Sequence, residues 1–146
     1  MITYEKTQPV DYNFDNFPIV YVKFNYITCD KDYDFFENSW LDLYKRNELF
    51  YFIFDTTDIH NIHLKYAYKL TTFINFLKRE IKNQYLKHSI IIVGNSILKN
   101  ILNFVFKIST PVAPVYIVNK VDYTDELCNN IINNKELSPN IIYVSN

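Results

Sequence analysis

Glycine is almost absent from this sequence, which contains only Gly94 in its 146 residues. Loops that cradle phosphate groups need several glycines at fixed spacing, so a P-loop and a dinucleotide-binding fingerprint are excluded. Cysteine is nearly as scarce. Cys29 and Cys128 stand far apart, without the Cys-x-x-Cys spacing of a zinc site or a redox motif, and we expect them to be free thiols in apolar surroundings.

The sequence also lacks long uninterrupted apolar runs. None approaches the ~18 residues of a transmembrane helix, and the N-terminus has no basic flank followed by an apolar core, as a signal peptide would have. These absences predict a soluble, cytoplasmic protein. Lysine far outnumbers arginine, and asparagine is also abundant. This bias is typical of the AT-rich coding sequences of some parasites and viruses. If the protein is viral, the expected cytoplasm is that of the host.

What is present indicates one folded domain with an uneven charge. Apolar residues make up 49% of the chain and aromatic residues 18%, which argues against disorder, and the length suits a single domain. Residues 59–107 carry 8 basic and 1 acidic side chain, whereas residues 1–58 carry 5 basic and 11 acidic ones. The basic middle segment could meet anionic lipid, phosphate or an acidic partner, although a solvated lysine face is the simpler interpretation.

Strand-like and helix-like patterns alternate along the chain. Strands are predicted at 17–25, 49–55, 89–95 and 114–119, and helices at about 30–46, 63–86, 96–109 and 122–134. We expect Thr28 or Asp30 to cap the first helix and Ser96 the third, and we place His88 at a helix C-terminus. Further edge strands are expected within 1–16 and near "IIYVS" in the tail, 135–146.

This alternation predicts a single α/β domain with a mostly parallel, four- to five-stranded sheet and helices on its faces. The strands at 49–55 and 89–95 are apolar on both sides, so they should be central strands that helices cover from each face. The carboxyl ends of parallel strands carry the ligand-binding groups of such sheets. The candidate site residues there are Asn25, Asp55, Thr56, Thr57, Asp58, Asn95, Ser96, Asn119 and Lys120.

The order of these elements, with "FIFDTT" at the end of one strand and "PVAPVYIV" leading into another, resembles STAS-like domains of the anti-sigma-factor antagonist superfamily, and in particular small stand-alone STAS/SEC14-type proteins. The resemblance covers roughly 17–134 and is carried best by Phe52–Thr57 and Phe106–Val118. It implies a non-enzymatic module that binds a protein partner, a lipid or a small anionic ligand. Some members are switched by phosphorylation in an Asp-Ser-Ser-Gly-like turn, and this sequence has only Thr56 and Thr57 as hydroxyl candidates there.

Two other interpretations of the strand-end residues lead to different chemistry. Asp55, Ser96 and Lys120 resemble the aspartate, hydroxyl and lysine of a response-regulator receiver, so the alternative function is a phosphoacceptor or small enzyme that uses the 55–58 cluster. The spacing Asp58-x-His60-x-x-His63 could chelate a metal if the turn folds back on itself, but a surface loop at a strand end is the simpler interpretation. We therefore predict no metal, no cofactor and no catalytic residues.

The predicted helix at 96–109 is too apolar for simple packing on a sheet. Its apolar residues occupy an arc of about 200°, whereas contact with a sheet needs a stripe of ~100° or somewhat more. Phe104 and Phe106 lie at the two margins of this arc. We predict that one of them is exposed and contacts a protein partner, a second copy of the chain or a membrane surface, while nucleic acid is not expected as a partner.

Overall fold

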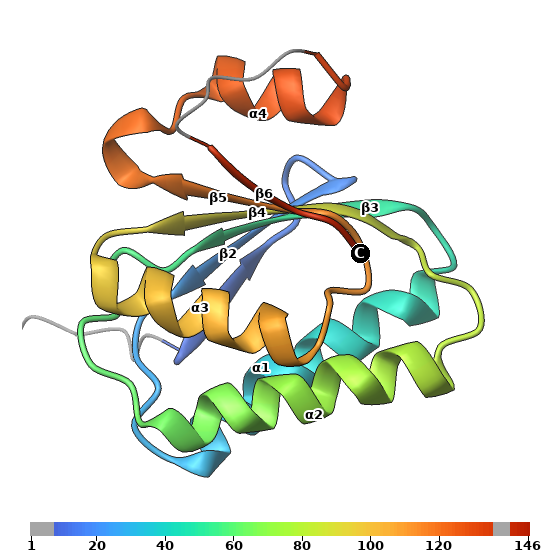
Figure 1. Cartoon of the computed structure of the whole chain (residues 1–146). Helices are drawn as coiled ribbons and strands as arrows, with labels where there is room; N and C mark the ends of the chain where they lie inside the picture. Colours follow the sequence, from blue (N-terminus) through green and yellow to red (C-terminus); the bar gives the residue numbers. More distant parts are fainter. Residues whose placement is uncertain (1–7, 136–140) are drawn as a thin grey trace, which may run out of the picture.

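The computed structural model describes residues 8–135 and 141–146, which form one α/β fold (Figure 1). The strands are β1 (Val10–Asn13), β2 (Ile19–Phe24), β3 (Phe50–Asp55), β4 (Leu86–Val93), β5 (Val115–Asn119) and β6 (Ile142–Val144). The α-helices are α1 (Asp30–Leu43), α2 (Leu64–Glu80), α3 (Ser96–Ile108) and α4 (Asp125–Ile132). Two short 3-10 helices are η1 (Tyr44–Arg46) and η2 (Lys120–Asp122). Within the described ranges, no helix is long and apolar enough to cross a membrane.

The six strands form one mixed sheet in the order β1-β2-β3-β4-β5-β6. The four strands from β2 to β5 are parallel, and the two edge strands β1 and β6 run antiparallel to their neighbours. The α/β class and the central position of β3 and β4 are thus as predicted. The sheet is wider and less parallel than predicted, because short edge strands at both ends of the chain add to it.

Helices α1, α2 and α3 cover one face of the sheet, and α4 lies on the other (Figure 1). Each of the first three connects a strand to its immediate parallel neighbour, and right-handed crossovers in one direction put all three helices on the same face. Successive side chains of β3 and β4 point alternately to the two faces of the sheet. Phe52 and Phe54 belong to the large core under α1–α3, whereas Ile53 packs with Cys128 and Ile131 in a smaller cluster under α4.

Helix α2 is shorter than predicted, because it ends at Glu80 and not at residue 86. The amide of Ile81 makes the last helical hydrogen bond, and the chain then turns back so that β4 begins at Leu86. The prediction that His88 ends a helix is wrong, since this residue lies inside β4. His88 is half-buried there, with its ring in contact with those of Tyr51 and Tyr116.

Helix α3 begins where predicted, but its cap is Asn95 and not Ser96. The Asn95 side-chain oxygen accepts the backbone N–H of Leu98 at 2.9 Å, and its amide donates to the carbonyl of Ile59 at 3.1 Å. Ser96 is the first helical residue and is exposed. One asparagine therefore starts α3 and ties it to the loop after β3.

Neither Thr28 nor Asp30 caps α1, whose N-cap residue is Cys29, without a side-chain hydrogen bond. Asp32 in the first turn instead reaches back, and its carboxylate accepts the Thr28 hydroxyl at 2.6 Å and the Thr28 backbone N–H at 2.9 Å.

Helix α4 starts later than predicted, at Asp125, because the preceding residues form η2 and Thr124 caps it. The predicted edge strands correspond to β1 and β6, while 1–7 and 136–140 lie outside the described residues.

Candidate functional site

The first candidate site is a polar cluster at the carboxyl end of β2 and β3. In their parallel register Lys23 pairs with Asp55, and Tyr21 pairs with Ile53 two residues earlier, on the same side of the sheet. Because side chains alternate between the two faces of a strand, Tyr21, Lys23 and Asp55 all lie on the α4 side of the sheet. The loop after β3 adds Thr57 and Asp58 to this group.

Asp55 is the centre of the cluster. Its carboxylate accepts hydrogen bonds from the Tyr21 hydroxyl, from the Thr57 hydroxyl at 2.7 Å and from the Thr57 backbone N–H at 3.0 Å. The Lys23 ammonium lies 3.5 Å from Asp55 and 3.1 Å from Asp58, and it donates to the Thr57 hydroxyl at 3.2 Å. All charged groups of the cluster are therefore paired with one another.

The protonation states in this cluster follow from its contacts. Burial alone would raise the pKa of Asp55, but the hydrogen bonds from Tyr21 and Thr57 and the charge of Lys23 lower it below the ordinary value. Burial and the hydrogen bond to Asp55 raise the pKa of Tyr21. Asp55 is thus held as a carboxylate and Tyr21 as a neutral hydroxyl, which is the combination that a stable hydrogen bond needs.

Thr56 points away from the cluster and is buried. Its hydroxyl donates to the carbonyl of Ile92 on β4 at 2.7 Å, so it is already used inside the protein. Gly94, after β4, lies close to the backbone of the loop after β3. A Cβ on Gly94 would lie 3.0 Å from the Thr57 carbonyl oxygen. The loops after β3 and β4 can approach this closely because Gly94 has no side chain.

The structure does not bring all of the predicted strand-end residues together. No hydrogen bond or ion pair between described residues links Asp55 to Ser96 or Lys120, as a receiver-like site would require. Lys120 is exposed at the start of η2. Asn95 is engaged as the cap of α3.

The Asp58, His60 and His63 triplet does not form a ligand set. In the part of the chain that the structure describes, no three His, Cys, Asp or Glu side chains gather closely enough to hold a metal ion. Asp58 pairs with Lys23. His63 caps α2 instead, with its Nδ1 accepting the Lys65 backbone N–H at 3.1 Å.

Sequence reasoning missed Tyr21 and Lys23. It took Asn25 as the end of the first parallel strand, whereas β2 ends at Phe24. The period of two in "YVKF" does show that Tyr21 and Lys23 share a face. What it does not show is that this face carries Asp55, because that depends on the register between β2 and β3.

The second candidate site is the outer face of α2 and α3, two helices that pack side by side (Figure 1). Five of the eleven exposed large apolar side chains in the described residues lie on this pair. They are Leu64 and Tyr68 on α2, and Ile97, Phe104 and Ile108 on α3. The rings of Tyr68 and Phe104 are in edge-to-face contact at 5.9 Å, which joins the two helices in one apolar surface. We call these five residues the α2–α3 face.

Helix α3 has an inner and an outer apolar stripe. Leu98, Leu102 and Val105 point inward and are buried. Ile97, Phe104 and Ile108 follow one another at spacings of seven and four residues, so they lie in one row about 100° around the helix from the buried stripe. Phe104 is 41% exposed, as predicted for one of the two rings, whereas Phe106 is half-buried and packs against the core.

The charged residues around the α2–α3 face are nearly all basic. The two helices carry Lys65, Lys69, Lys78, Arg79, Lys99 and Lys107, against Glu80 as their one acidic residue. Asp30 of α1 neutralises part of this charge through ion pairs with Lys65 at 3.1 Å and Lys69 at 3.6 Å. The exposed apolar row therefore lies in positive surroundings.

No protein-family model, no curated protein and no solved structure matches this chain in comparisons with known proteins.

Proposed function

We propose that this chain is a non-enzymatic interaction module of STAS-like type, and that it binds the surface of an anionic membrane through its α2–α3 face. The observation that carries the proposal is the exposed row of Ile97, Phe104 and Ile108 on a pair of helices with six basic residues and one acidic residue. Support for the STAS-like part comes from four consecutive parallel strands with α1–α3 on one face.

An anionic bilayer suits both properties of this face. Apolar side chains can enter the boundary between headgroups and acyl chains, while lysines on the same helices remain near the lipid phosphates. Each lysine or arginine near an anionic surface contributes about 1 kcal/mol, and this attraction weakens as salt is added. Lys107 follows Phe104 by three residues on α3, so the two are neighbours on the helix. Neither Lys107 nor Lys99 makes an ion pair with a described residue.

Vesicle sedimentation tests the proposal. The wild-type chain should bind vesicles of phosphatidylcholine mixed with phosphatidylserine, and bind vesicles of phosphatidylcholine alone much more weakly. Phe104→Ser should weaken this binding about tenfold, because an aromatic ring no longer enters the bilayer. Its melting temperature should hardly change, since Phe104 is 41% exposed. Lys107→Glu should weaken binding several-fold, and most strongly at low salt.

Matched controls lie elsewhere on the chain. Phe35 on α1 is exposed to a similar extent, 37%, and lies outside the α2–α3 face, so Phe35→Ser should bind like the wild type. Lys45 is exposed near η1, and Lys45→Glu should likewise leave vesicle binding unchanged. Equal binding by the wild type and Phe104→Ser, or no preference for phosphatidylserine, would contradict the membrane assignment. Dimerisation that Phe104→Ser abolishes would instead assign the face to a second copy of the chain.

The alternative function, a phosphoacceptor at Asp55, has less support. The Asp55 carboxylate is occupied by Tyr21, Thr57 and Lys23, and the Thr56 hydroxyl is buried. Incubation with acetyl phosphate and magnesium should therefore leave the intact mass of the protein unchanged. A stoichiometric gain of one phosphate that is lost in Asp55→Asn would favour the phosphoacceptor over the interaction module.

A further inference from the structure

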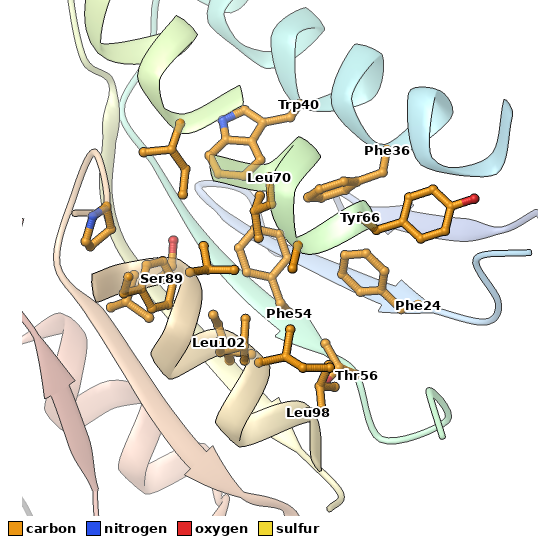
Figure 2. A pocket seen from close by; sticks show the side chains of 18 of the residues that line it. Phe24, Phe36, Trp40, Phe54, Thr56, Tyr66, Leu70, Ser89, Leu98 and Leu102 are labelled. Atoms are coloured by element: carbon orange, nitrogen blue, oxygen red, sulfur yellow. The ribbon is translucent and has the colours of Figure 1, made fainter. Parts of the chain in front are cut away.

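A cavity of about 130 Å³ lies inside the large core, between the sheet and helices α1–α3. Figure 2 shows the side chains that enclose it: Phe36 and Trp40 from α1, Leu70 from α2, Phe54 from β3, and Leu98 and Leu102 from α3. Protein interiors are normally packed as densely as organic crystals, with few voids larger than a water molecule. A space of this size in the middle of a core is therefore unusual.

The cavity offers almost nothing to water. Its wall is nearly all apolar. Its two small hydroxyl side chains are Thr56, which already donates to the Ile92 carbonyl, and the buried Ser89 (Figure 2). A buried water molecule needs two to four polar partners, and apolar cavities without them stay dry. A comparable cavity of roughly 150 Å³ lined by Leu, Ile and Phe binds benzene or xenon. The space thus suits a hydrocarbon group and not a polar molecule.

Three buried residues at the contact between α2 and α3 lie apart from the main core, beside the cavity. Ala67 and Ile74 of α2 and Val105 of α3 are buried and line the cavity, yet they form a cluster separate from the main core. Leu70 and Phe106 pack against both clusters and are only half-buried. Along the contact between α2 and α3, the cavity is thus lined in part by side chains that also reach the surface.

We propose that this cavity is a binding site for a hydrocarbon group of about six carbon atoms, which enters between α2 and α3. The group can be a small aromatic molecule or the end of an acyl chain, since both offer the same apolar surface. This site is distinct from the α2–α3 face, and it does not require the membrane contact proposed above. The two proposals can therefore fail separately.

Methyl NMR of the whole chain tests the site, with benzene and decanoate as separate probes. Benzene should shift the methyl signals of Leu98, Leu102 and Val105, which line the cavity, in a saturable way. The methyl signals of Ile53 on β3 and Ile131 on α4, which pack together on the other face of the sheet, should not move and serve as the internal control. Shifts with benzene alone would identify a small aromatic ligand, and shifts with both probes an acyl chain. No selective shift with either probe would overturn the proposal.

Substitutions give an independent measurement. Ala67→Leu places three extra carbon atoms in the cavity, so it should weaken benzene binding at least about tenfold. Cys128→Val changes a small buried residue of α4, on the other face of the sheet, and should leave benzene affinity unchanged. If Ala67→Leu does not fold, Leu102→Ala provides the test, because a larger cavity should admit naphthalene, which the wild type should exclude. Unchanged benzene affinity in folded Ala67→Leu, or no naphthalene binding by Leu102→Ala, would overturn the proposal.

Discussion

The Asp55 carboxylate accepts three hydrogen bonds and pairs with one ammonium group. Removing its charge should therefore lower the free energy of unfolding more than removing the charge of Asp58 does. The Asp55 side chain is 14% exposed, whereas that of Asp58 is 60% exposed and pairs with Lys23. We expect Asp55→Asn to lower the free energy of unfolding by about 2 kcal/mol, as for a buried hydrogen bond to a charged group. Asp58→Asn, the matched control, should change it by less than about 1 kcal/mol, the range of exposed ion pairs. Urea unfolding at neutral pH measures both.

The same carboxylate predicts how stability depends on pH. Because the folded-state pKa of Asp55 lies below its ordinary value of 3.8, the unfolded chain binds its proton first as the pH falls. The contribution of Asp55 is therefore fully present above about pH 5 and is lost as the pH falls through 3.8 and below. The difference in unfolding free energy between the wild type and Asp55→Asn should be constant from pH 7 to 5 and shrink below pH 4. A difference that grows in acid would show that Asp55 is not held as a carboxylate.

Gly94 provides a second test at the scale of one residue. An added methyl group would meet the Thr57 backbone at 3.0 to 3.2 Å, which forces the loop after β3 to move. Gly94→Ala should destabilise the protein by about 1 to 3 kcal/mol, as overpacking usually does. The NMR signals of Tyr21 and Lys23 should also shift, because Thr57 links this loop to them. Unchanged signals together with unchanged stability would contradict the close approach.

At the scale of elements, the start of α3 distinguishes two adjacent residues. Asn95 caps the helix and also bonds to the Ile59 carbonyl, whereas the exposed Ser96 is the first helical residue. We expect Asn95→Ala to lower the free energy of unfolding by about 1 kcal/mol, the usual effect of a lost N-cap, and Ser96→Ala to change it little. Thermal unfolding of the two variants side by side gives the answer. A larger loss for Ser96→Ala would mean that the cap is one residue later.

The two stripes of α3 could be predicted only in part. Its composition already showed more apolar surface than one sheet contact can bury. Which ring stays outside depends on α2, because Tyr68 meets Phe104 on the outer side while Phe106 packs inward. Periodicity places residues around a helix, but it does not say where the neighbouring helix lies.

At the scale of the whole molecule, the two cores should unfold together. They share β3 and β4, whose alternate side chains serve both faces, so loss of α4 alone would expose Ile53 and its neighbours to water. Trp40, the one tryptophan, contacts four phenylalanine rings under α1–α3, and the buried Cys128 reports on α4. In a Cys29→Ser background, Trp40 fluorescence and Cys128 labelling should show the same urea midpoint. Labelling at clearly lower urea would mean that α4 undocks on its own.

The α/β class, the two central strands and most helix positions follow from local pattern alone. A strand such as "FYFIFD" with apolar residues on both sides has to be covered from both sides, and helices between such strands are typical of the crossovers of a parallel sheet. Strand and helix ends were less predictable, as β4 and α2 show. They depend on where the chain turns toward its partner strand, and no local residue marks that point.

Contacts between distant residues were decided by the tertiary structure. Tyr21 and Lys23 meet Asp55 across more than thirty positions, because one particular register places β2 beside β3. The cavity depends on how far three helices stand from the sheet, which is set by the fit of side chains such as Trp40 and Phe54. Periodicity in the sequence indicates which residues share a face within one turn of a helix or two residues of a strand. The register between strands and the packing between helices and sheet are determined only when all the elements come together.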